Sequence, residues 1–139
     1  MIKVLFVCVH NSGRSQMAEA FFNRYSAGAA LSYSAGTRPA SHVDSNVVSA
    51  MRERGIDISR QVPKVIIPGM IEDADRVVTM GCMADEVCPA MFIPTEEWQI
   101  EDPEGQSLEK VRVIRDEIQN RVQGLIRDIS IESCINGRR

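Results

Sequence analysis

Short apolar runs and segments of helical spacing alternate along the chain. Residues 2–7 are apolar except for one lysine, which predicts a buried strand. Met17, Phe21 and Tyr25 then recur at helical spacing and predict a first helix over residues 15–25. The same patterns predict strands at residues 31–34, 75–80 and 90–94, and a short helix after Gly69. They also predict a helix that Ser41 or Asp44 caps, with an apolar face made of Val43, Val47, Ala50 and Met51.

The last long pattern runs from Leu108 to Ile129, where apolar residues trace one face of a single helix. A loop at residues 98–106 precedes it, and we expect residues 130–139 to form a loosely held tail. Strands that alternate with helices indicate an α/β fold, a three-layer sandwich in which helices cover both faces of a parallel sheet. The chain has no linker or internal repeat, so we predict a single domain over residues 1–139.

The candidate chemistry lies where the first strand ends and the first helix begins. Cys8 closes the strand and Arg14 opens the helix. The amides of such a loop, together with the free N–H groups of a helix start, favour an anion. Arg14 can bind two oxygens of an oxyanion, and Ser15 can donate a hydrogen bond to the sulfur. The sequence therefore predicts a reactive Cys8 thiolate and an oxyanion-binding loop made of Val9, His10, Asn11, Ser12, Gly13 and Arg14.

Composition narrows the classes of function. The formal net charge is −3 and the basic residues are scattered, so we expect neither nucleic acid nor membrane as a partner. No segment approaches the ~18 apolar residues that span a bilayer. The first apolar run is too short for a signal peptide, so we expect a cytoplasmic protein. Its four cysteines then favour catalysis, redox chemistry or metal binding over static disulfides. The Cys82 to Cys88 spacing does not suit zinc, and we expect no bound metal.

Two sets of residues resemble a known family. Residues 8–15, with the sequence CVHNSGRS, resemble the C-x5-R-S signature loop of the low-molecular-weight tyrosine phosphatase superfamily. Residues 79–82, 88–89, 102–105 and 115–118, together with Trp98, are similar to the thioredoxin-coupled arsenate reductases of that superfamily. The resemblance covers nearly the whole chain except the tail. It implies a four-stranded parallel sheet with the strand order 2-1-3-4.

The resemblance also implies a mechanism and its residues. Cys8 attacks arsenate, Cys82 attacks the thiol–arsenate adduct so that arsenite leaves, and Cys88 takes over the disulfide and presents it to thioredoxin. Asp102 matches the general acid of the phosphatases, with Glu101 as the alternative if the register differs by one. The implied external reductant is thioredoxin, with no bound cofactor, and we expect a monomer. The Cys82–Cys88 spacing is one residue shorter than in the best-known relatives.

Polar residues near the loop complete the predicted site. We expect Asn11, Glu19 and Ser34 to support the loop. Some family members place potassium near the equivalents of these residues, with threonine and aspartate as further ligands. Val62 and Lys64 stand at those two positions, so we expect no potassium site here. We also expect His10 to face solvent, with a loop-facing residue that modulates Cys8 as the alternative, and Cys134 to be an incidental surface thiol.

Two other functions compete with arsenate reduction. A low-molecular-weight tyrosine phosphatase would use Cys8, Arg14 and Asp102 through a phosphocysteine intermediate. Phosphatases of that family tend to carry tyrosines after Asp-Pro, whereas Glu104 and Gly105 follow here. The two further thiols favour the reductase, with weak phosphatase side activity because phosphate and arsenate share shape and charge. The third possibility is a redox sensor or oxyanion-binding module without turnover.

Overall fold

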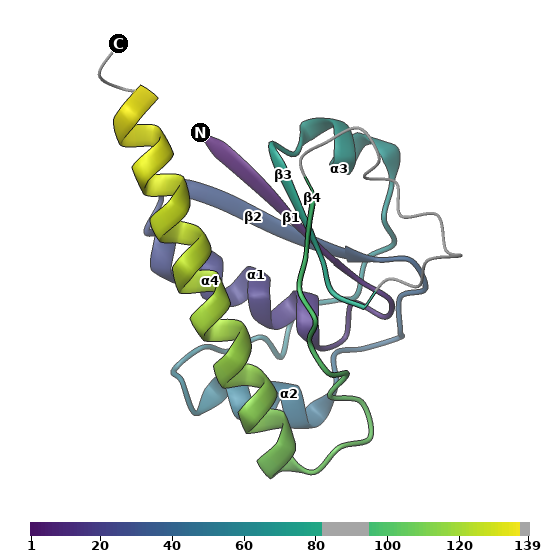
Figure 1. The fold of residues 1–139 in the computed structure, drawn as a ribbon. Helices are drawn as coiled ribbons and strands as arrows, with labels where there is room; N and C mark the ends of the chain where they lie inside the picture. Colours follow the sequence, from purple (N-terminus) through teal and green to yellow (C-terminus); the bar gives the residue numbers. More distant parts are fainter. Residues whose placement is uncertain (82–94, 137–139) are drawn as a thin grey trace.

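The computed structural model describes residues 1–81 and 95–136, and the side chains as far as Ser130. Within these residues one parallel sheet has the strand order β2-β1-β3-β4 (Figure 1). Its strands are β1 Ile2–Cys8, β2 Ala30–Gly36, β3 Arg76–Thr79 and β4 Thr95–Glu97. The helices are α1 Arg14–Ser26, α2 Ser45–Arg52, α3 Pro68–Asp73 and α4 Leu108–Asn136. The predicted α/β class and strand order are confirmed.

The central strand β1 divides the core into two layers. Val4, Phe6 and Cys8 belong to a cluster that includes the buried faces of α1, α2 and α4. Leu5 and Val7 point to the opposite face and pack in a second cluster with residues of α3. Because side chains alternate along a strand, one apolar run supplies both faces. Helices therefore cover the sheet on both sides, as a three-layer sandwich requires.

Two boundaries differ from the sequence prediction. Helix α4 continues to Asn136, beyond the predicted end near Ile129, while the loose attachment of residues 130–139 stays a prediction. Residues 130–136 contain neither glycine nor proline, so nothing in the backbone ends the helix before Gly137. The predicted fourth strand, residues 90–94, lies outside the described residues. The structure has β4 at Thr95–Glu97, an exposed edge strand whose polar residues give no strand signal. Of the two predicted caps for α2, Asp44 is the one that accepts the backbone N–H of Asn46.

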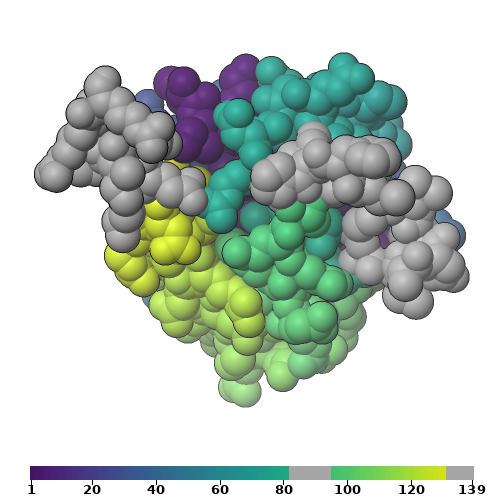
Figure 2. Space-filling view, turned by 45° about the horizontal axis from the view of Figure 1, so that its top comes forward, coloured from purple at the N-terminus to yellow at the C-terminus, as the bar shows by residue number. Residues whose placement is uncertain are grey.

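The segment after β4 connects the edge of the sheet to the long helix. Trp98 and Ile100 are buried in the same cluster as the apolar face of α4. In Figure 2 this segment, in green, lies directly beside the yellow-green helix. The segment is thereby held at the carboxyl ends of the strands, where ligands bind in open α/β sheets. Across the described residues, none of the helices is both long and apolar enough to cross a bilayer.

An ion network joins α2 to α4. The Glu53 carboxylate accepts from Arg112 at 2.7 Å and from Arg115 at 2.7 Å. The Arg115 guanidinium is buried and also donates to the Ala50 carbonyl oxygen at 3.0 Å. Hydrogen bonds from Arg112 and then from Arg115 lower the pKa of Glu53 from 4.5 to about 2. The network therefore needs an ionised Glu53.

We expect Glu53→Gln to lower the melting temperature at neutral pH by a few degrees. Because folding lowers the pKa of Glu53, its contribution is complete above pH 4.5 and disappears as the pH falls towards about 2. In thermal melts across this pH range, the melting temperatures of the variant and the wild type should therefore converge at the acid end. Glu72→Gln, on the exposed side of α3, is the matched control. A difference between wild type and variant that persists unchanged at the acid end would contradict the role of the ionised network.

Candidate oxyanion site

The loop between β1 and α1 has its amide groups turned inward. The carbonyl oxygens of Cys8, Val9, His10 and Ser12 accept hydrogen bonds from the backbone of residues 37–44. In a trans peptide the N–H of the next residue points away from the carbonyl, and no described peptide bond is cis. The N–H groups that follow these four carbonyls therefore face the opposite side, towards the interior of the loop. This arrangement, at the start of α1, is an anion-binding cradle.

A directed hydrogen-bond chain ends at the sulfur of Cys8. The backbone N–H of Lys64 donates to Asn11 Oδ1 at 2.9 Å, which fixes the orientation of the Asn11 amide because a backbone N–H can only donate. Asn11 Nδ2 then donates to Ser15 Oγ at 2.6 Å. The Ser15 hydroxyl proton remains for Cys8 Sγ, 2.8 Å away. All three side chains are buried, so the sulfur, the hydroxyl and the amide are held in one hydrogen-bonded arrangement away from water.

Arg14 lies at the other side of the cradle, at the first position of α1. Its Nη1 donates to the Ile100 carbonyl oxygen at 3.2 Å, and its Nη2 lies 3.6 Å from Asp102 Oδ2. A Cβ on Gly81 would collide with Nη1, and Gly81 also has a positive φ of 78°. Glycine at this position therefore leaves the room that the guanidinium occupies. The buried cation faces the same cradle as Cys8.

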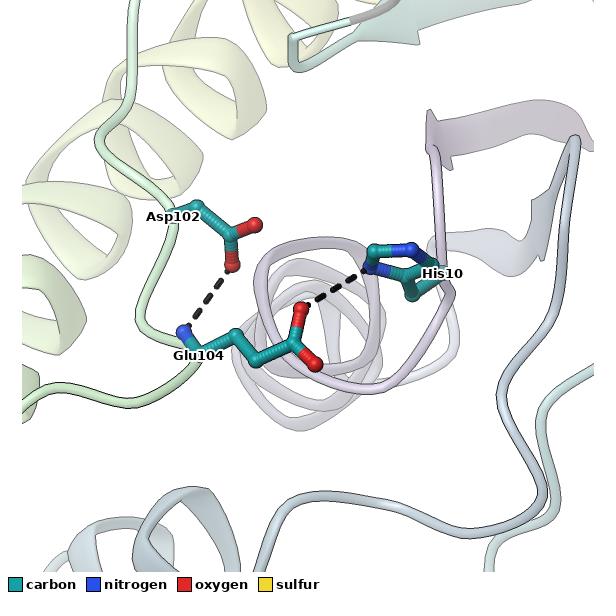
Figure 3. A group of neighbouring side chains, drawn as sticks. All are labelled: His10, Asp102 and Glu104. Carbon is teal, nitrogen blue, oxygen red and sulfur yellow. Dashed lines mark hydrogen bonds and ion pairs between the residues drawn. The ribbon is translucent and has the colours of Figure 1, made fainter.

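The segment from Ile100 to Gln106 crosses the mouth of the loop. Pro103 packs so closely on Gly13 that a Cβ there would lie 2.7 Å from Pro103 Cγ. His10 Nδ1 lies 3.3 Å from Glu104 Oε2, and the His10 side chain stays partly exposed, so the imidazole faces both solvent and the neighbouring loop. Figure 3 shows the two side chains pointing towards each other from different loops, with α1 seen along its axis behind them. Sequence spacing could not reveal this contact, since it joins distant loops.

Glu101 and Asp102 have different partners. Glu101 pairs with Lys110 at 3.1 Å and accepts from Gln106 at 3.2 Å. Asp102 instead faces Arg14, while its Oδ1 accepts the Glu104 backbone N–H at 3.0 Å. This geometry favours the predicted register, with Asp102 as the carboxylate at the oxyanion loop.

The predicted supporting residues are brought together in different ways. Asn11 is itself a residue of the loop. Gln16, which the sequence analysis missed, donates from Nε2 to Asn11 Oδ1 at 3.0 Å. Glu19 lies next to the buried Ser34, and burial raises the pKa of Glu19. The Lys64 ammonium is 4.0 Å from the Glu19 carboxylate. Lys64 therefore joins two parts of the site, through its ammonium and through its backbone N–H. The sequence carries no signal for these contacts of Lys64, because they join segments that are distant in the chain.

His10, Asp102 and Glu104 offer one donor atom each, all within 4.8 Å of one another. One imidazole and two carboxylates are a donor set that suits a divalent transition metal. Here, however, Asp102 faces the Arg14 guanidinium and Glu104 faces His10. We therefore interpret the three as an ion-paired cluster, and the absence of a bound metal stays a prediction. Cys82 and Cys88 lie outside the described residues, as does the side chain of Cys134.

Known proteins match this chain over nearly its whole length. Residues 3–134 match the low molecular weight phosphotyrosine protein phosphatase family. A glutaredoxin arsenate reductase of Synechocystis is 41% identical over 134 residues, covering 94% of this chain and 100% of the relative. An arsenate reductase of Brevibacillus brevis is 41% identical over 122 residues, covering 86% and 90%. The structure of a thioredoxin-dependent arsenate reductase of Corynebacterium glutamicum superposes with a TM-score of 0.80 at 36% identity, covering 95% of this chain and 63% of that one.

We expect Ser15→Ala to slow the alkylation of Cys8 at neutral pH several-fold, because it removes the hydroxyl that donates to the sulfur. The measurement is the rate of iodoacetamide labelling of the Cys8 peptide by mass spectrometry, as a function of pH. Ser59→Ala, in an exposed loop, is the matched control and should label at the wild-type rate. Equal rates for Ser15→Ala and the wild type at every pH would mean that Ser15 does not stabilise the thiolate.

We expect added potassium to leave activity and melting temperature unchanged, because the Lys64 ammonium already faces Glu19. The comparison is between potassium chloride and sodium chloride at equal ionic strength, by thermal melting and by turnover. Lys64→Met is the informative variant, since it removes the ammonium and retains the backbone N–H that holds Asn11. A clear potassium-specific shift in the wild-type protein would refute the prediction.

Proposed function

Because the chain belongs to the low molecular weight phosphotyrosine protein phosphatase family, with arsenate reductases among its relatives, we propose that it reduces arsenate to arsenite. The observation that carries the proposal is the buried Cys8 sulfur, which lies 2.8 Å from the Ser15 hydroxyl inside an oxyanion cradle. Arsenate fits such a cradle because its charged oxygens match inward-facing amides and a guanidinium.

In the first step the Cys8 thiolate attacks arsenic and forms a sulfur–arsenic bond. One arsenate oxygen leaves as water, and Asp102 supplies the proton because it lies at the loop mouth, 3.6 Å from Arg14. Arg14 and the loop amides balance the charge that gathers on the remaining oxygens. Arsenic is still pentavalent at this point, so the enzyme has changed bonds but has transferred no electrons.

Reduction takes place in the second step. The Cys82 thiolate attacks the sulfur of Cys8, and the electron pair of the sulfur–arsenic bond moves onto arsenic, which leaves as arsenite. The two sulfurs are oxidised to a Cys8–Cys82 disulfide, and arsenic gains the two electrons that they lose. Cys88 then attacks Cys82, which releases Cys8 as a thiolate and leaves a Cys82–Cys88 disulfide. These roles of Cys82 and Cys88 come from the sequence resemblance alone.

The external reductant in our proposal is thioredoxin, whose dithiol returns the Cys82–Cys88 disulfide to two thiols. The thioredoxin-dependent relative from Corynebacterium glutamicum supports this choice. The Synechocystis relative is a glutaredoxin arsenate reductase, so a glutaredoxin system is the direct competitor. We further propose that the protein is cytoplasmic and monomeric, and that it binds no cofactor.

A second activity follows from the same geometry. Cys8, Arg14 and Asp102 are sufficient for attack on a phosphate ester, release of an alcohol and hydrolysis of the phosphocysteine. Neither Cys82 nor Cys88 takes part in that cycle. We therefore expect weak phosphatase activity beside arsenate reduction.

The decisive assay is arsenate-dependent NADPH consumption with thioredoxin and thioredoxin reductase. The wild type should turn over, and Cys8→Ser, Cys82→Ser and Cys88→Ser should each abolish turnover, because every thiol carries one step of the relay. Cys134→Ser is the matched control and should retain activity.

Aryl phosphate hydrolysis separates the alternatives. It should be lost in Cys8→Ser and survive in Cys82→Ser and Cys88→Ser. If arsenate gives no turnover with any thiol system and aryl phosphate is hydrolysed well, the protein is a phosphatase. If glutaredoxin with glutathione supports turnover and thioredoxin does not, the choice of reductant is wrong while arsenate reduction stands.

A further inference from the structure

His10 and Glu104 are in close polar contact at the mouth of the oxyanion loop, beside the carboxylate of Asp102, and they form an ion pair when the imidazole is protonated. His10 Nδ1 and Glu104 Oε2 are 3.3 Å apart, and donor atoms of all three side chains lie within 4.8 Å of one another. His10 belongs to the oxyanion loop, whereas Asp102 and Glu104 belong to the segment that follows β4. Figure 3 shows that the pair spans the space between these two loops.

The geometry of the reaction shows which part of a substrate would meet this pair. A nucleophilic displacement at arsenic or phosphorus places the leaving oxygen opposite the attacking sulfur. The acid that protonates the leaving oxygen must be within hydrogen-bond reach of it. If Asp102 is that acid, the leaving oxygen lies beside Asp102, and any group attached to it extends into the space that His10 and Glu104 occupy.

We propose that the His10–Glu104 contact is a size filter on the leaving group, which admits inorganic oxyanions and hinders aryl phosphate esters. The inference rests on the proposed roles of Cys8 and Asp102. Arsenate and phosphate lose only a water-sized group, so the closed pair does not obstruct them. An aryl ester must separate the pair before its leaving oxygen reaches Asp102.

Two further contacts hold the backbone on either side of Glu104, so that access to the loop mouth depends on the two side chains. Pro103 packs against Gly13, and Asn46 Nδ2 donates to the Gln106 carbonyl oxygen at 3.2 Å, so both sides of Glu104 are held in place. The Glu104 side chain itself is 62% exposed and His10 is 40% exposed. Among the described residues, their contact can therefore open by rotation of the two side chains, without movement of the backbone.

Removing the Glu104 side chain should change selectivity. We expect Glu104→Ala to raise kcat/KM for para-nitrophenyl phosphate about 5-fold, the scale of one exposed ion pair. The inhibition constant of inorganic arsenate in the same assay should change by less than about 2-fold, because the cradle is untouched. Glu72→Ala, an exposed acid on α3, is the matched control and should leave both values unchanged.

Salt provides a readout that a merely structural role would not move. Sodium chloride at about 1 M screens exposed charges, so the ratio of variant to wild-type aryl phosphate activity should fall towards one. The double variant His10→Gln/Glu104→Ala should raise aryl phosphate activity no further than Glu104→Ala alone, because both variants lose the same contact.

The filter is testable even without turnover. Inorganic phosphate should protect Cys8 from alkylation equally in the wild type and Glu104→Ala, whereas phenylphosphonate should protect the variant better. Equal selectivity of the two proteins in both assays would overturn the filter. Failure of arsenate reduction with both the thioredoxin and the glutaredoxin systems would instead overturn the proposed function, since the binding and hydrolysis assays do not require the relay.

Discussion

The conformation of Asn11 is the constraint on which the site depends. Asn11 is buried with a φ of 50°, a left-handed conformation that costs roughly 1 kcal/mol for most residues and that asparagine tolerates best. Three groups hold its amide: the Lys64 N–H, Gln16 and the Ser15 hydroxyl. Because the amide orientation is fixed, the serine proton is directed at Cys8. A strained residue thus serves both the shape of the loop and the chemistry of its sulfur.

The sheet brings the other half of the site to the loop. β1 ends at Cys8 in the centre of the sheet, and β3 ends one strand away, just before Gly81. The segment after β4 returns across the same edge because Trp98 and Ile100 are anchored in the core. Arg14 contacts both the Ile100 carbonyl oxygen and Asp102, so one guanidinium links the cradle to its proposed acid.

Charge alternates across the mouth of the site. Arg14 faces Asp102, and His10 faces Glu104, so both carboxylates have a basic side chain beside them. Such pairing limits the repulsion that two acidic side chains would exert on an incoming anion. The same arrangement places side chains where a large leaving group would extend. One set of contacts therefore serves substrate binding, proton transfer and selection by size.

The sequence alone determined the α/β class, most element positions and the pairing of Cys8 with Arg14, because these follow from local periodicity and from residues a few positions apart. The resemblance supplied the strand order and pointed to Asp102. The sequence could not place the end of α4 or the exposed edge strand β4, because buried neighbours and pairing partners decide where these elements begin and end. Only the tertiary structure placed Glu104 against His10 and the Lys64 amide on Asn11. Each of these contacts joins segments that are distant in the chain, and it forms because the packed sheet brings separate loops to one edge.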